Sequence, residues 1–248
     1  MNMDYFSTRR TVRRFSDRPV DRKLLDEMIE AASHAPNTGN MQLYSVVVTS
    51  DESLRRALAP AHFNQPASTG CRLMLTFCAD FNRFEHWCRI NDAVPGYNNF
   101  QAFMWAVIDT VIFAQQFCTI AEQRGLGCCY LGTTTYNAPQ IADVLGLPDR
   151  VVPVVTLALG YPEGEAALSD RLPLNAIMHT EHYREFDDDE IRRMYSYKES
   201  LPESARFVEE NGKKSLAQVY TDVRYASHDN LNFSRLYHDF VVSRGFDM

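Results

Sequence analysis

The chain lacks any uninterrupted apolar run of the ~18 residues that a membrane-spanning helix requires. Its start, Met1 to Asp4, also lacks the basic and apolar stretches of a secretory signal. We therefore expect a cytoplasmic protein with no membrane partner. Basic residues are few as well: 25 lysines and arginines against 32 aspartates and glutamates leave a formal net charge of −7. Because a nucleic acid requires a broad basic face, no nucleic-acid partner is expected.

Repeated C-x-x-C spacing is absent among the six cysteines. Cys128 and Cys129 are adjacent and would point to opposite faces of a strand, which suits neither a disulfide nor a shared metal. We expect buried, reduced thiols. His179 and His182 flank Glu181 in a segment without a third ligand, so no metal site is expected.

The hydrophobic pattern predicts helices that alternate with strands. Asp21 is a candidate cap for the first helix, and the acidic run 187–190 is expected to begin a later one. Helices are predicted at 21–34, 98–124, 138–145 and 231–242, and strands at 43–49, 72–79, 128–131 and 151–160. With no linker to divide the chain, this alternation predicts an α/β sandwich.

An arginine-rich segment near the N-terminus is the main candidate for a site. Arg9, Arg10, Arg13 and Arg14 lie within six positions of an otherwise acidic chain. Guanidinium groups suit phosphate oxygens, although a solvated helix with surface ion pairs would show the same pattern. Three further segments offer hydroxyls, amides or a lone arginine: 36–42, 130–134 and 169–173. Together they supply the groups that a phosphorylated heterocycle needs.

In this order the segments resemble the nitroreductase family of flavoproteins, especially its oxygen-insensitive NADPH nitroreductases and flavin reductases. The family opening R/H-R-S/T-x-R-x-F with a following P-V reads Arg9-Arg10-Thr11-Val12-Arg13-Arg14-Phe15 and Pro19-Val20. The G-L-G-x-x-Y-x-G element is present at residues 125–132, L-G-x-P at 159–162 and R-L-P at 171–173. The resemblance covers nearly the whole chain and is strongest in its first two-thirds.

The resemblance implies an α+β fold: an α-β-α sandwich around a mixed, mainly antiparallel sheet, in an intertwined homodimer. It implies one FMN-binding domain over residues 1–248. A C-terminal extension, about 186–248, would contribute to dimer contacts and to the substrate-side loop.

The resemblance also implies noncovalent FMN at the dimer interface. Arg9, Arg13 and Arg171 would hold the phosphate, with Arg10 and Thr11 directed toward the flavin. A backbone N–H near Gly132 or Thr133 would face N5, and His62 is a weaker candidate for substrate contact. The residues expected along the ring and ribityl chain are Asn37, Thr38, Gly39, Asn40, Gln42, Gln65, Tyr130, Leu131, Gly132 and Thr133. No side chain is expected to act as a base or nucleophile, because FMN carries the chemistry.

The implied reaction is ping-pong hydride transfer from NADPH or NADH to a nitroaromatic, a quinone or free flavin. Ser169 stands where close relatives place a lysine, and Arg206, Lys213 and Lys214 have no clear counterpart in the family's nucleotide loop. The choice between NADPH and NADH therefore stays open. So do two alternatives: a non-catalytic FMN store or sensor, and a structural α/β protein that binds another phosphorylated ligand.

Overall fold

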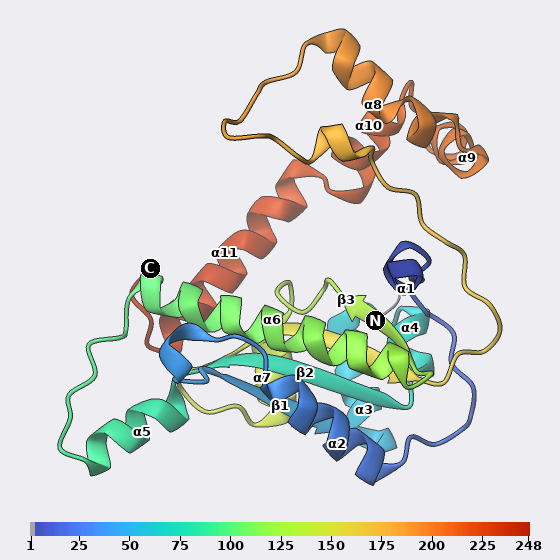
Figure 1. Ribbon diagram of the computed structural model, residues 1–248. Helices are drawn as coiled ribbons and strands as arrows, with labels where there is room; N and C mark the ends of the chain where they lie inside the picture. The colour runs from blue at the N-terminus through green and yellow to red at the C-terminus, as the bar shows by residue number, and fades with distance from the viewer. Residues whose placement is uncertain (1–2) are drawn as a thin grey trace. The chain divides into compact units, whose positions relative to one another are not determined.

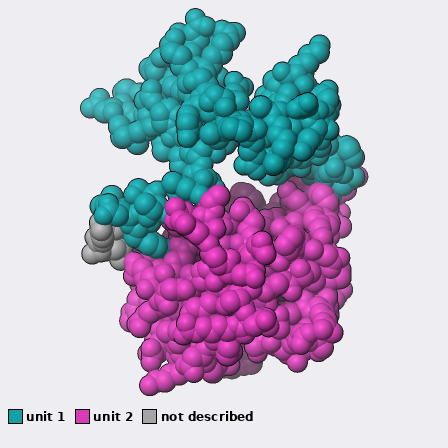
Figure 2. Space-filling view, turned by 90° about the vertical axis from the view of Figure 1, so that its right-hand side faces the viewer, with its two compact units in different colours: residues 1–8, 168–232 teal, residues 9–167, 233–248 magenta. Residues whose placement is uncertain are grey.

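The computed structural model describes residues 3–248, which form two compact units coloured separately in Figure 2. Unit 1 contains residues 3–8 and Leu168–Asn232. Unit 2 contains Arg9–Ala167 and Phe233–Met248. The expected single domain over 1–248, with its extension from about 186, stays a prediction.

Unit 2 is built on a four-stranded sheet. Its strands are β1 (Tyr44–Thr49), β2 (Leu73–Asp80), β3 (Gly127–Leu131) and β4 (Val151–Gly160). They lie in the order β1-β2-β4-β3, and each neighbouring pair is antiparallel. Every residue of the inner strand β2 is buried, including the polar Thr76 and Asp80. The expected α+β fold with a mainly antiparallel sheet is confirmed.

Helices cover both faces of this sheet. In Figure 1, α2 (Arg22–Ser33) and α6 (Phe100–Gln123) lie in front of it, where they pack on Leu75, Phe77 and Cys128. The opposite face packs on α3 (Glu52–Leu58), α4 (Pro66–Gly70) and α7 (Ala138–Leu145) through Met74 and Cys129. Since neighbouring strand residues alternate between faces, Cys128 and Cys129 separate as predicted.

Side-chain caps explain where several helices begin. Asp21 accepts a hydrogen bond from the Leu24 N–H at the start of α2, and Asn99 accepts one from Ala102 at the start of α6. Asp187 and Glu190 form a capping box before α8 (Asp188–Ser200), so the acidic run begins a helix as predicted.

The remaining elements are short apart from the last helix. Unit 1 also holds α1 (Met3–Ser7), η3 (Leu174–Ala176), α9 (Pro202–Glu210), α10 (Leu216–Val219) and η4 (Tyr220–Arg224). Helix α11 (Ser227–Ser243) ends in unit 2, where Phe240 and Val241 join a buried cluster. Unit 2 further contains η1 (Thr38–Asn40), η2 (Ala59–His62) and α5 (Asn82–Ile90).

Helix α6 is long and apolar enough to cross a membrane by length and composition alone. Its most apolar 18-residue window has a mean hydropathy of 1.4, and 44% of that window is buried inside the structure. Polar residues such as Asp109 interrupt this window, so it is not an uninterrupted apolar run. A buried helix of a protein core passes the same test, and α6 packs against the sheet.

The arginine-rich segment runs across the ends of β3 and β4. The Val12 N–H donates to the Cys128 carbonyl over 3.2 Å, and the Ser16 N–H donates to the Tyr161 carbonyl over 2.9 Å. A Cβ added at Gly127 would lie 2.5 Å from the Val12 Cβ, and one at Gly160 would lie 3.0 Å from Phe15 Cδ1. The segment therefore approaches the sheet closely only because both positions are glycine.

The close approach at Gly127 predicts that Gly127→Ala destabilises the protein. The added methyl would overlap Val12, and overpacking of this kind costs about 1–3 kcal/mol. The midpoint of urea unfolding should fall. Gly70→Ala is the matched control, because nothing lies within 4 Å of a Cβ at Gly70. Equal midpoints for the two variants would contradict the packing account.

Candidate functional site

The four arginines of the N-terminal segment have different surroundings. Arg9 pairs with Glu122 at 2.9 Å, Arg10 with Glu165 at 3.0 Å and Arg14 with Glu163 at 3.3 Å. Arg13 is exposed and has no ion pair within residues 3–248. Arg13 and Thr11 line a hollow of about 190 Å³ together with residues 163–167. Arg13 is thus the member of the segment whose guanidinium is available to an anion.

Arg9 is held by a buried group of side chains from α6 and β3. Its Nη1 donates to Thr11 Oγ1 over 3.3 Å, and its Nη2 reaches Cys118 Sγ at 3.7 Å as well as Glu122. A hydrogen bond with Cys118, together with burial, raises the pKa of Cys128. The sulfur atoms of Cys118 and Cys128 and a Glu122 oxygen lie within 4.8 Å of one another, as metal ligands would. Because the cationic Arg9 contacts two of these groups, the cluster serves to bind Arg9.

The loop expected to contact the flavin is anchored to α6 by one carboxylate. The backbone N–H and the hydroxyl of Thr38 both donate to Asp109 Oδ1 over 2.9 Å. Asp109 is 1% exposed, and its Oδ2 has no partner among the described residues. Asp109 was not among the predicted site residues, although a lone acidic residue within an apolar helical stripe is a recognisable signal.

The same loop has an unusual backbone. Gly39 and Asn40 have φ of 56°, and Gln42 has φ of 55°, all in the left-handed region. Asparagine tolerates this conformation better than most residues. The side chain of Asn37 accepts a hydrogen bond from the Gln42 N–H over 3.2 Å, which closes the loop. The exposed side chains of Asn40 and Gln42 are therefore presented from a fixed turn.

Two segments predicted separately meet at the end of β3. Thr133 Oγ1 lies 2.9 Å from His62 Nδ1, and Gln65 Nε2 donates to the same oxygen over 3.4 Å. Burial lowers the pKa of His62 to about 4. Tyr130 donates to Gln115 Oε1 on α6 over 3.2 Å, and burial raises its pKa. Leu131 is buried and Gly132 is exposed.

Aromatic rings flank this meeting point. Tyr136 stacks on Phe233 of α11 with ring centroids 4.4 Å apart, and Phe63 lies 6.2 Å from the same ring. Phe63 follows His62 in the chain and is 55% exposed. An exposed aromatic side chain beside neutral hydrogen-bond donors is suited to binding a flat ring system.

Arg171 belongs to unit 1, whereas the other predicted site residues belong to unit 2. Its Nη1 donates to the backbone carbonyls of Ser169 and Asp170 over 3.3 and 2.8 Å. Lys198 pairs with Asp170 at 2.9 Å, and this hydrogen bond raises the pKa of the lysine.

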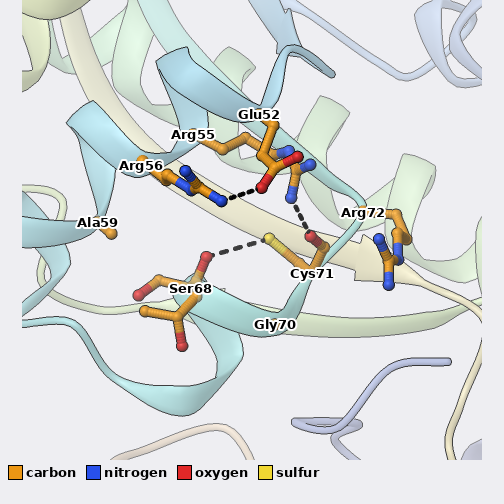
Figure 3. A pocket seen from close by; sticks show the side chains of 9 residues that line it. Glu52, Arg55, Arg56, Ala59, Ser68, Gly70, Cys71 and Arg72 are labelled. Atoms are coloured by element: carbon orange, nitrogen blue, oxygen red, sulfur yellow. Dashed lines mark hydrogen bonds and ion pairs between the residues drawn. The ribbon is translucent and has the colours of Figure 1, made fainter. Parts of the chain in front are cut away.

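A larger hollow of about 330 Å³ lies between α3, α4 and the start of β2 (Figure 3), and none of the predicted residues line it. Its three arginines already have protein partners. Arg55 donates to the Cys71 carbonyl over 2.5 Å, Arg56 pairs with Glu52, and Arg72 pairs with Asp17. The Arg55 contact joins α3 to the residue that ends α4, and the Arg72 contact joins the residue before β2 to the N-terminal segment.

Comparisons with known proteins identify relatives of this chain. The model of the nitroreductase family matches residues 6–161. The FMN reductase (NADPH) of Bacillus subtilis is 29% identical over 246 residues, which cover 96% of this chain and 95% of that protein. The oxygen-insensitive NADPH nitroreductase of Salmonella typhimurium is 32% identical over 78% of each chain.

A solved crystal structure from Bacteroides fragilis is also similar. It is 47% identical with a TM-score of 0.97, and the match covers 99% of this chain and 100% of that one. The resemblance inferred from the motifs is thereby confirmed. Since the family model spans more than half of the residues, the chain belongs to the nitroreductase family.

Proposed function

We propose that this protein is an FMN-dependent NAD(P)H oxidoreductase that reduces small organic oxidants. The family match and the relatives described above support the cofactor, the electron donor and the enzyme class. One observation supports a particular residue as a cofactor ligand. Arg13 is exposed, and it is the one arginine of its segment without an ion pair within residues 3–248.

The donors of unit 2 fit FMN chemically. Arg13, with Arg9 and Thr11 beside it, would hold the phosphate, since guanidinium groups bind phosphate oxygens through forked hydrogen bonds. Asn40, Gln42, Gln65 and Thr133 offer neutral hydrogen-bonding groups for the ring and the ribityl chain. The contacts of the other expected residues with FMN stay predictions. These residues are Arg10, Asn37, Thr38, Gly39, Tyr130, Leu131, Gly132 and Arg171.

When bound, FMN supplies the centre that accepts and delivers hydride. The residues of the chain bind and orient the reactants, and no side chain needs to act as a general base. Asp109 holds the Thr38 loop in place, and the buried contacts of Arg9 keep the phosphate end ordered. Oriented binding of this kind accounts for a large part of such a rate enhancement.

We further propose that nitroaromatics, quinones or free flavins are the oxidants and that NAD(P)H and oxidant bind in turn at one face. A homodimer is proposed as well. Ile108, Val111 and Ile112 on α6 are 49%, 44% and 36% exposed in the single chain, and a partner subunit would remove this apolar surface from water. A cytoplasmic location stays a prediction.

If the protein binds FMN, the purified protein should be yellow. NAD(P)H should bleach the yellow flavin colour in the absence of air. The measurement is the flavin absorbance band before and after addition of the nucleotide. A colourless protein that takes up no FMN would contradict the proposal. A yellow protein that does not oxidise NAD(P)H with a nitroaromatic or a quinone would favour the flavin store or sensor.

Loss of Arg13 should weaken FMN binding. A hydrogen bond to a charged group contributes about 1.5–3 kcal/mol, so Arg13→Ala should raise the Kd for FMN by roughly 10- to 100-fold. Arg14→Ala is the matched control, because Arg14 pairs with Glu163 on the exposed surface. The Kd is measured by quenching of flavin fluorescence. If both variants bind FMN as tightly as the parent, Arg13 is not the phosphate ligand.

Parallel steady-state assays with NADPH and NADH should give a higher kcat/KM for NADPH. The reason is that both relatives compared in sequence carry NADPH in their names. Each nucleotide is tested against a nitroaromatic, a quinone and free FMN. Parallel lines in double-reciprocal plots are expected for the ping-pong order, and intersecting lines would refute that order.

A further inference from the structure

His62 is a buried histidine that the proposed reaction does not itself require. It ends η2, and the two residues after it, Phe63 and Asn64, have φ of 54° and 50°. The Asn137 side chain donates to the Ala61 carbonyl over 2.8 Å and holds this turn against the segment that follows β3. His62 itself is 0% exposed. Its ring is therefore fixed beside Thr133 by packing and by the backbone.

The surroundings of the ring decide which nitrogen carries the proton. Burial lowers the pKa of His62 to about 4, so near neutral pH the imidazole is uncharged and has one N–H. Nδ1 lies 2.9 Å from Thr133 Oγ1, whereas Nε2 is buried without a partner among the described residues. A proton on Nε2 would leave a buried donor unsatisfied, which native proteins rarely do. The proton is therefore on Nδ1 and is donated to Thr133.

The oxygen of Thr133 then has no free lone pair. A hydroxyl oxygen accepts two hydrogen bonds, and Gln65 Nε2 is the second donor at 3.4 Å. The hydroxyl hydrogen of Thr133 must consequently be donated to a third group. Thr133 is half-buried and follows the exposed Gly132, where a Cβ would meet nothing within 4 Å. The turn at Gly132 therefore leaves open space beside Thr133.

We propose that His62 and Gln65 fix the hydroxyl of Thr133 as an outward hydrogen-bond donor for an acceptor on the edge of the FMN ring. His62 is thus a positioning residue that acts through Thr133. The proposal rests on the function proposed above, since it requires FMN beside Thr133. The C4 carbonyl oxygen and the N5 atom of oxidised flavin are both acceptors, and a donor preset toward them costs no reorganisation when the ligand binds.

The tautomer is tested on the protein without reference to FMN. Long-range ¹H–¹⁵N NMR spectra distinguish protonated from unprotonated ring nitrogens, and the signals of His62 are those that disappear in His62→Asn. We expect a protonated Nδ1 and an unprotonated Nε2 near neutral pH. A protonated Nε2 would overturn the inference, whether or not the protein binds FMN.

The action through Thr133 is tested by the affinity for oxidised FMN. His62→Leu and Thr133→Val should each raise the Kd about tenfold, and the double variant should bind no worse than Thr133→Val. His62→Asn is the conservative control, because its amide N–H takes the place of Nδ1–H, and its Kd should stay within about twofold of the parent. Urea unfolding establishes that each variant is folded.

Additive effects of His62→Leu and Thr133→Val would overturn the proposal, as would His62→Asn binding as weakly as His62→Leu. A parent protein that binds no FMN would refute the proposed function instead. The NMR result would then still decide how the Thr133 hydroxyl is held.

Discussion

The polar side chains of one long apolar helix hold the candidate site together. Along α6, Asp109 holds the Thr38 loop, Gln115 accepts from Tyr130, and Glu122 pairs with Arg9. Asp109 and Glu122 are 13 positions apart, or about 20 Å at the rise of an α-helix. Because α6 also packs against the sheet, the three segments are fixed relative to one core element. The loops supply the hydrogen-bonding groups, and the helix keeps them in place.

The arginine-rich segment also packs against glycines of two other motifs, at residues 125–132 and 159–162. Gly127 leaves room for Val12, and Gly160 leaves room for Phe15. The hydrogen bond from Val12 to Cys128 then places the arginines across the end of the sheet. Carboxylates from elsewhere in the chain pair with three arginines of the segment, Arg9, Arg10 and Arg14. The unpaired positive charge that a small anion would meet is therefore that of Arg13.

The local elements of unit 2 follow from short-range signals. The apolar spacing and the Asp21 cap predict α2, and the structure begins that helix at Arg22. The apolar runs predict β2 and β4, which are buried because they occupy the centre of the sheet. The motifs were also enough to identify the family, whose model covers the segments that carry them. The helices α3 and α4 were not predicted, since helices of seven and five residues carry little periodicity. The nine-residue helix α5 was not predicted either.

The sequence by itself determined which groups are available: the arginines, the small polar loop, the glycine turn, and the helices and strands that carry them. Only the tertiary structure decided how these groups pair. Arg9 meets Glu122, Thr38 meets Asp109, and His62 meets Thr133, each across a long stretch of chain. Such pairs depend on which helix packs on which face of the sheet, and local spacing does not encode this. For the same reason, only the folded structure shows that Thr38 is the partner of Asp109 and Thr133 the partner of His62.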